Sequence, residues 1–393
     1  MSSTCCKQSD KPNCFGKSYL TGYSRCYAKC ILSGEHSVVY GQPALVMSLK
    51  DKFLETDVKV YKNKTAKKLI AESKDGLYAR DLKWGCKISE INPKTNSKTH
   101  SNTEIIYSES GFLSDLIAGS KLWYERHEEN LLHYNAVYDR PIDLALHAIV
   151  DILSSILFET SACDLVLDLE HKLEHKLRKK IKFTYIEIDI RSCIPIGRGY
   201  GSSACLISSI VQSFNEAFSL GLSQEEVFQK VYNLECYQHG KSSGVDPLIA
   251  VLGGVQYMMP TNPPSLSNAV ELKVNNNLID HIQFLDSGSC ESSTGESVSY
   301  VRGLYEKTLK HSCFDWGLWA EVTNQMRIAL ENNNYDLFVE SIQKNHRLLE
   351  QIGVVPETVQ AKIKDLERDG GYAKISGAGS VSGDGAGLVL FIK

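Results

Sequence analysis

The sequence predicts a two-domain protein in which strands and helices are mixed. The chain has 393 residues, of which 42% are hydrophobic, and this is enough to build more than one core. Residues 182–218 read as a strand, a glycine-rich loop and a buried helix. The three prolines within residues 260–264 read as a linker. We therefore expect a loose tail at 1–21, a first domain at 22–260, and a second domain at 265–393 whose last strand could return to the first.

The net charge, the cysteine spacing and the lack of long apolar segments indicate which kinds of molecule the protein binds. The formal net charge of -4 gives no general attraction to nucleic acid. The twelve cysteines include no Cys-x-x-Cys pair, so neither a zinc ribbon nor a disulfide framework is readable. Residues 1–20 lack an apolar segment, and no later stretch reaches 18 consecutive apolar residues. These observations predict a cytoplasmic protein that acts on small molecules, without nucleic-acid or membrane partners.

The first predicted strand ends among charged side chains. Cys26, Ala28, Cys30 and Leu32 alternate with more polar residues, which is typical of a half-buried strand. Lys29, Glu35 and His36 lie at or just after its end and are candidate site residues, although each alone is more often a solvated strand end or a satisfied histidine. Residues 53–87 then read as a hairpin around the Asp75-Gly76 turn.

A helix is predicted over 142–158, and a charged segment follows it. His171 and His175 match the inverted zincin pattern His-x-x-Glu-His. The segment continues into lysines and an arginine that would repel a cation, so we interpret it as an exposed helix without metal chemistry.

The glycine-rich loop is the most informative stretch. Residues 182–190 alternate as a strand and lead into Pro195, after which Gly197, Gly199 and Gly201 can adopt positive φ. A periodic apolar helix then opens at Ser202, Ser203 and Ala204. Backbone amides at such a helix start can bind an anion. The dinucleotide fingerprint would need glycine at position 202, and the Walker A motif would need Gly-Lys-Ser/Thr, so neither known phosphate loop fits. A connection without any ligand remains an alternative.

Two further carboxylates follow the loop. Ser223 and Glu226 form a capping box that opens a second helix, which carries Glu235 near its end. Asp246 then stands between Gly244 and Pro247 on a short turn, where an aspartate is ordinarily a capping residue.

The second half repeats the combination of strand and glycine turn. A strand at 281–285 precedes helical patterns at 316–332 and 335–349. Lys374 leads into a second glycine-rich turn, with Gly377 and Gly379, between apolar strands. Two glycine loops indicate one ligand held from both sides.

Together, these motifs resemble those of the GHMP small-molecule kinases. The resemblance spans about residue 23 to the end and rests on Lys29, the Ser33–Gly41 segment, the Pro195–Ala204 loop, the His239–Asp246 segment and the Lys374–Gly379 turn. It implies two α/β domains, the first ribosomal-protein-like and the second ferredoxin-like, with ATP and substrate in the cleft between them. It also implies transfer of a phosphoryl group to the primary hydroxyl of mevalonate, and a possible homodimer.

The resemblance assigns roles to single residues. Asp246 and Lys29 would face the substrate hydroxyl as the catalytic pair, and Glu35, His36 and Thr294 would contact or support the substrate. Mg²⁺ would be held by Glu235 and by Ser203, or by Ser202 in its place. The ATP phosphates would be held by the two glycine loops, through Pro195, Gly197, Gly199, Gly201, Ser202, Ser203, Ala204, Gly377 and Gly379.

Two departures and two alternatives remain. Tyr200 stands where the family usually has leucine, and residues 380–384 replace a short run of glycines and a cysteine with a longer loop that includes Asp384. Because a carboxylate turned inward would repel ATP, we expect Asp384 to face solvent. The alternatives are a kinase of the same superfamily that acts on phosphomevalonate or a sugar, and a non-catalytic sensor with the same fold.

Overall fold

The computed structural model gives the positions of most of the chain. The described residues are 19–62, 83–91, 103–112, 140–158, 183–239, 242–274, 276–311 and 314–393. The predicted tail up to residue 18, the Asp75-Gly76 turn, and both His171 and His175 lie outside these ranges. No helix within them has the length and apolar character needed to span a bilayer.

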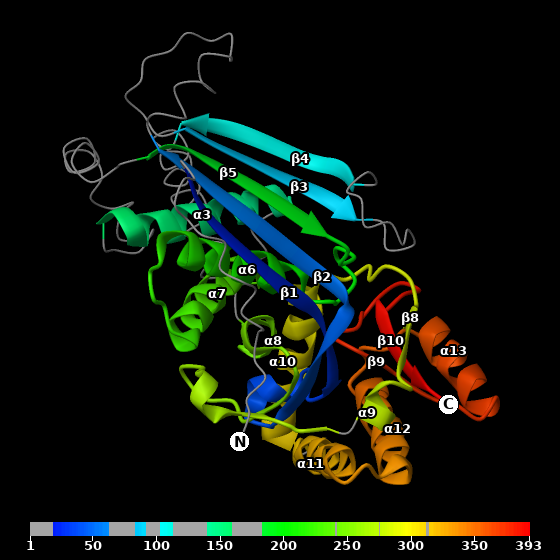
Figure 1. Ribbon diagram of the computed structural model, residues 1–393. Helices are drawn as coiled ribbons and strands as arrows, with labels where there is room; N and C mark the ends of the chain where they lie inside the picture. The colour runs from blue at the N-terminus through cyan, green and yellow to red at the C-terminus, as the bar shows by residue number, and fades with distance from the viewer. Residues whose placement is uncertain are drawn as a thin grey trace.

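A large mixed sheet runs from the top of the molecule into its lower half (Figure 1). Within the described residues its order is β4-β3-β5-β2-β6-β7, and β1 pairs with β2. All pairings are antiparallel except that of β3 with β5. The strands are β1 (Tyr19–Ser33), β2 (Ala44–Lys62), β3 (Lys83–Ile91), β4 (Thr103–Phe112), β5 (Phe183–Ser192), β6 (Val255–Met258) and β7 (Ala269–Glu271).

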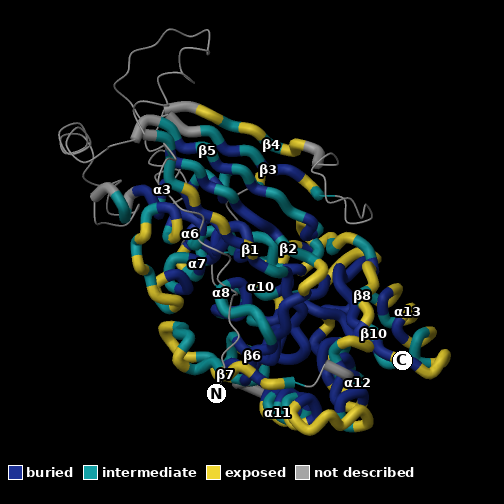
Figure 2. The backbone as a smooth tube through the Cα atoms, viewed as in Figure 1, coloured by how far each residue is buried: buried dark blue, intermediate teal, exposed yellow. Residues whose placement is uncertain are grey.

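Helices cover one face of this sheet because apolar and polar side chains alternate along the strands, so that one face is apolar. In β5 the side chains of Ile186, Ile188 and Ile190 are buried, as the alternation predicts. They join one apolar cluster with Phe214 and Ile149 of the covering helices, so this face is the main core (Figure 2). The helices are α3 (Pro141–Phe158), α6 (Ser202–Phe218), α7 (Gln224–His239) and α8 (Val245–Leu252).

A second, smaller sheet has the order β8-β10-β9 within the described residues. The last strand, β10, lies between β8 and β9 and is antiparallel to both. Longer helices pack beside it (Figure 1). The elements of this half are α9 (Asn276–Ile279), β8 (Gln283–Asp286), α10 (Thr294–His311), α11 (Gly317–Glu331), α12 (Tyr335–Gln351), α13 (Glu357–Arg368), β9 (Tyr372–Ile375) and β10 (Leu388–Ile392). Two 3₁₀ helices, η1 (Ser37–Tyr40) and η2 (Leu266–Asn268), complete the described elements.

Most predicted elements are present, and two details differ. The predicted hairpin over 53–87 is wrong, because β5 lies between β2 and β3 in the sheet. The predicted turn around Asp246 is instead the first turn of helix α8. The division at residue 265 stays a prediction, although β7 still pairs with β6 in the first sheet beyond it.

Candidate functional site

The glycine loop is held in a conformation that favours glycine at three positions. Gly197, Gly199 and Gly201 have φ values of 69°, 79° and 72°. Gly201 is the N-cap of α6, so the helix begins immediately after the loop. The carbonyl of Tyr200 accepts a hydrogen bond of 2.9 Å from the Lys29 amide, which fixes the loop to β1. The backbone amides at this helix start therefore lie beside the end of the first strand.

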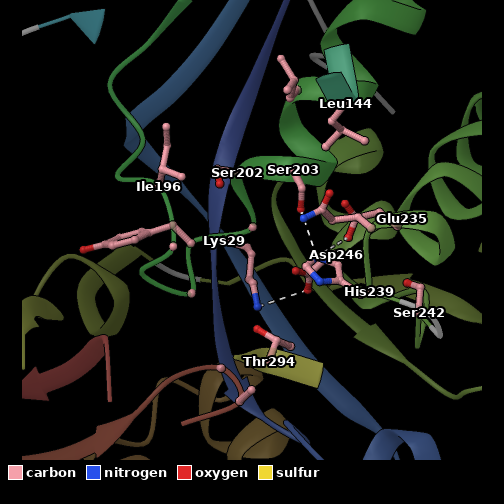
Figure 3. Close-up of a pocket in the computed structure, with 18 of the residues that line it drawn as sticks. Lys29, Leu144, Ile196, Ser202, Ser203, Glu235, His239, Ser242, Asp246 and Thr294 are labelled. Atoms are coloured by element: carbon pink, nitrogen blue, oxygen red, sulfur yellow. Dashed lines mark hydrogen bonds and ion pairs between the residues drawn. The ribbon is translucent and has the colours of Figure 1, made fainter. Parts of the chain in front are cut away.

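Lys29 and Asp246 form an ion pair across the site. The distance from Lys29 Nζ to Asp246 Oδ1 is 3.2 Å (Figure 3). Lys29 comes from β1 and is only 5% exposed, whereas Asp246 is partly exposed in the first turn of α8. The helix follows Gly244, whose φ of 85° again favours glycine. Two residues more than 200 positions apart thus present an ammonium and a carboxylate side by side.

A second polar group lies next to this pair. Glu235, on α7, is 1% exposed, and its Oε1 atom has no hydrogen-bond partner among the described residues. Burial raises the pKa of this carboxyl above its ordinary value, and the nearby Asp246 carboxylate acts in the same direction. His239 Nε2 lies 3.6 Å from Glu235 Oε2 and 3.4 Å from Ser203 Oγ. Figure 3 shows all three side chains close to Asp246.

Residues from the C-terminal part of the chain contact Glu35 and His36 at the site. Glu35 is paired with Lys374 of β9, and neither side chain is exposed. Lys374 Nζ also donates to the carbonyl of Ile31 at 3.2 Å. The ring of His36 forms a hydrogen bond of 2.9 Å between Nε2 and the Ala378 carbonyl oxygen. Burial lowers the pKa of His36, which favours the neutral ring.

These groups surround one cavity of about 330 Å³. Leu144 and Ile196 add apolar wall beside the polar groups (Figure 3). The predicted site residues that line the cavity are Lys29, Glu35, His36, Gly197, Gly199, Gly201, Ser202, Ser203, Glu235, Asp246, Thr294 and Gly377. Three predicted residues are not among its lining.

The remaining three have other surroundings. Ala204, in the first turn of α6, is fully buried in the main core. Gly379 packs against the backbone of Val354, where a Cβ atom would meet the carbonyl oxygen at 2.1 Å. Pro195 precedes the loop and is half-buried.

Two features of the site were not predicted from the sequence, whereas the expected exposure of Asp384 is confirmed. His239 was given no role and Lys374 no partner. The periodicity of helix α7 and the alternation of strand β9 carry no information about contacts with distant residues. Tyr200 is buried in the main core. Asp384 is exposed, as expected.

Comparison with known proteins agrees with this geometry. The family described as "GHMP kinases N terminal domain" matches residues 165–254. The chain is 32% identical to a mevalonate kinase from Archaeoglobus fulgidus over 193 residues, which are 49% of this chain and 62% of that protein. It is 26% identical to a mevalonate kinase from Pyrococcus abyssi over 366 residues, covering 90% of this chain and 84% of that protein.

A solved structure extends the likeness to the whole fold. The mevalonate kinase of L. major, in complex with R-mevalonate, superposes with a TM-score of 0.61 at 17% identity, covering 96% of this chain and 89% of that one. At this identity the likeness shows the fold, and it confirms the predicted two-domain GHMP fold. Residues 165–254 therefore resemble the N-terminal domain of the GHMP kinases. The relatives described above are mevalonate kinases.

Proposed function

We propose that this protein phosphorylates the primary hydroxyl of mevalonate with ATP, giving 5-phosphomevalonate in the mevalonate route to isoprenoids. The observation that carries the proposal is the Lys29–Asp246 pair in a cavity roofed by the glycine loop. The names of the relatives, one of which aligns with 90% of the chain, support the choice of substrate within the family.

The glycine loop and the start of α6 are proposed to hold the ATP phosphates. Three glycines with positive φ line the cavity at the start of α6, and the positive end of the helix dipole favours an anion there. The turn at Gly377 and Ala378 lines the same cavity, and it lies beside the first loop, because a Cβ atom at Gly377 would be 3.8 Å from Gly199 Cα. ATP would thus be held between elements of both halves of the chain.

Asp246 is proposed as the general base. Its carboxylate takes the proton from the substrate hydroxyl as the hydroxyl oxygen bonds to the γ-phosphorus and the bond to the ADP oxygen breaks. Lys29 stabilises the negative charge that develops on the hydroxyl oxygen, and it fixes the carboxylate by the 3.2 Å contact. A carboxylate and an ammonium in contact suit this step because one accepts the proton and the other stabilises the oxygen.

The residues near Glu235 fit a divalent cation. Glu235 offers a buried carboxylate oxygen without a partner among the described residues, and Ser203 offers a hydroxyl from the first turn of α6. Mg²⁺ prefers oxygen ligands of this kind. We propose that Ser203 and Glu235 hold Mg²⁺, with Ser202 as the alternative to Ser203. The ion would supply charge neutralisation for the phosphates.

The opposite end of the cavity is proposed to bind the acid. His36 and Thr294 line it, and the Lys374 ammonium compensates the charge of Glu35. Without this compensation the Glu35 carboxylate would repel a carboxylate substrate. Glu35 therefore contributes to binding through its pair with Lys374 as well as through any contact of its own.

The direct test is ADP release measured with a coupled assay. The panel contains mevalonate, phosphomevalonate, galactose and glycerate, each with ATP and Mg²⁺. We expect mevalonate to give at least a hundredfold higher kcat/KM than the others. A higher value for phosphomevalonate or a sugar would replace mevalonate as the substrate. ATP binding without turnover on any of them would favour a sensor.

The cytoplasmic location and a homodimer stay predictions. The described cysteines are all free thiols, in keeping with the proposed location. A homodimer is tested by light scattering of the purified protein.

A further inference from the structure

The imidazole of His239 lies between the two groups proposed to hold the cation. Its Nε2 atom is 3.4 Å from the Ser203 hydroxyl oxygen and 3.6 Å from Glu235 Oε2 (Figure 3). Glu235 lies one helical turn earlier on α7, whereas Ser203 comes from α6. One ring therefore contacts a carboxylate on its own helix and a hydroxyl on the neighbouring helix.

Phosphoryl transfer as proposed above gives this ring no task. Asp246 accepts the proton, Lys29 stabilises the hydroxyl oxygen, and the glycine loop binds the phosphates. Mg²⁺ prefers oxygen ligands, so an imidazole nitrogen is a poor direct ligand for it. A histidine at a helix C-terminus also interacts favourably with the helix dipole, and that alone would explain its presence if nothing else were near.

The surroundings of His239 favour a more specific role. Its ring lines the same cavity as Ser203, Glu235 and Asp246, with its side chain 29% exposed. Glu235 is nearly inaccessible and retains an oxygen, Oε1, without a hydrogen-bond partner among the described residues. Contact of His239 with Oε2 restrains the rotation of the carboxylate, which fixes where Oε1 can lie.

We propose that His239 is a positioning residue that sets the spacing between the Ser203 hydroxyl and the Glu235 carboxylate for a divalent cation. The inference rests on the proposed function, because it needs a cation at these two oxygens. Groups that orient metal ligands in this way typically change metal affinity by about 10- to 100-fold when they are removed. The effect acts on the cation and leaves the phosphate-binding amides of the loop in place.

The experiment measures Mn²⁺ binding to the full-length protein in the presence of ADP, by the electron paramagnetic resonance signal of free Mn²⁺. His239→Ala is expected to weaken Mn²⁺ binding by about tenfold or more. His239→Gln, which keeps a side-chain donor, is expected to recover part of the loss. Asn233→Ala, at an exposed position on the same helix, is the matched control and should bind Mn²⁺ like the wild type.

Binding of ADP in EDTA separates positioning from general damage. We expect all three variants to bind metal-free ADP within twofold of the wild type. Mn²⁺ affinity in His239→Ala within twofold of the wild type would overturn the inference while leaving the proposed function intact. Equal losses for Mn²⁺ and for metal-free ADP would also overturn it, since that pattern indicates a disturbed helix. If the wild type adds nothing to the affinity of ADP alone for Mn²⁺, the cation site in the proposed function is itself wrong.

Discussion

Asp246 occupies the second position after the cap of helix α8, where an acidic side chain is common for reasons unrelated to catalysis. An acid in the first turn of a helix stabilises it by interacting with the helix dipole. The 3.2 Å contact with Lys29 and the cavity beside it favour a chemical role in addition. Loss of the Asp246 charge would lower only the stability of the protein if the residue acts on the helix dipole, and it would lower the reaction rate if the residue has a chemical role.

Asp246→Asn keeps the shape of the side chain but cannot accept a proton. We expect the rate of the chemical step to fall by roughly 10²- to 10⁴-fold, because general base catalysis contributes about that much. ATP affinity should change little. Single-turnover phosphorylation of mevalonate measures the step directly. Asp336→Asn is the matched control, since Asp336 is the second residue after the cap of α12 and is exposed.

A rate for Asp246→Asn within threefold of the parent would remove this residue from the mechanism. In that case both variants should show only the loss of a helix-dipole interaction, roughly 0.3–1 kcal/mol of stability.

Single residues were predictable to the extent that their type and their local motif carried the information. Lys29 lies within β1, Glu235 near the end of α7 and Asp246 in the first turn of α8. A charge among apolar neighbours is conspicuous at each position, and the structure brings all three to one cavity. The pairing of Glu35 with Lys374 joins residues 339 positions apart, and no local pattern encodes it. His239 was missed because its partner Ser203 lies on a different helix.

At the level of elements, the glycine loop controls the position of Lys29. A Cβ atom at Gly201 would lie 2.8 Å from Lys29 Cγ and 3.5 Å from Asp246 Oδ2. Gly221, after α6, has the same φ of 72°, but a Cβ atom there would meet no other atom within 4 Å. Substitutions at the two glycines therefore distinguish the effect of backbone strain from the effect of displacing the Lys29–Asp246 ion pair.

Gly221→Ala should lose about 1–2 kcal/mol of stability, because it places an L side chain in the left-handed region, and Gly201→Ala should lose at least as much. Only Gly201→Ala should lose most of its turnover, since its methyl group must displace Lys29. Urea unfolding and kcat on mevalonate are measured for both variants. Equal kcat values for the two variants would show that the close approach of residue 201 to Lys29 does not affect turnover.

The elements themselves were predictable where periodicity was strong. The alternation in β1 and β5 and the apolar stripe of α6 gave the correct element types. Helix α8 was missed because Gly244 and Pro247 read as a turn, although proline is tolerated in the first helical turn. The false hairpin shows the limit of local reasoning, since the strand that separates β2 from β3 comes about 90 residues after β3.

At the level of the whole molecule, His36 links the segment after β1 to the last glycine turn. Its hydrogen bond reaches Ala378, 342 residues away. Burial lowers the pKa of His36 below its ordinary value of 6.5. In the unfolded chain the ring binds a proton below about pH 6.5, whereas in the folded protein it stays neutral to lower pH. Protonation therefore favours the unfolded state.

The stability contributed by neutral His36 should be complete above about pH 6.5 and should decline as the pH falls below it. The largest slope for one group is about 1.4 kcal/mol per pH unit. We expect the free energy of unfolding, measured in urea between pH 7.5 and 5.5, to fall more steeply for the wild type than for His36→Gln. Parallel curves for the two proteins would contradict the assignment.

The end of β1 depends on contacts with residues more than 300 positions later in the chain. The Ile31 amide donates to Ser376 Oγ, Ser33 Oγ accepts a hydrogen bond from Asn345, and Glu35 pairs with Lys374. Contacts at such separations form slowly, because a long loop must close before they stabilise anything. When the chain is made on the ribosome, this strand end therefore waits for the final fifth of the sequence. Nucleotide binding should accordingly be among the last properties that the newly made protein acquires.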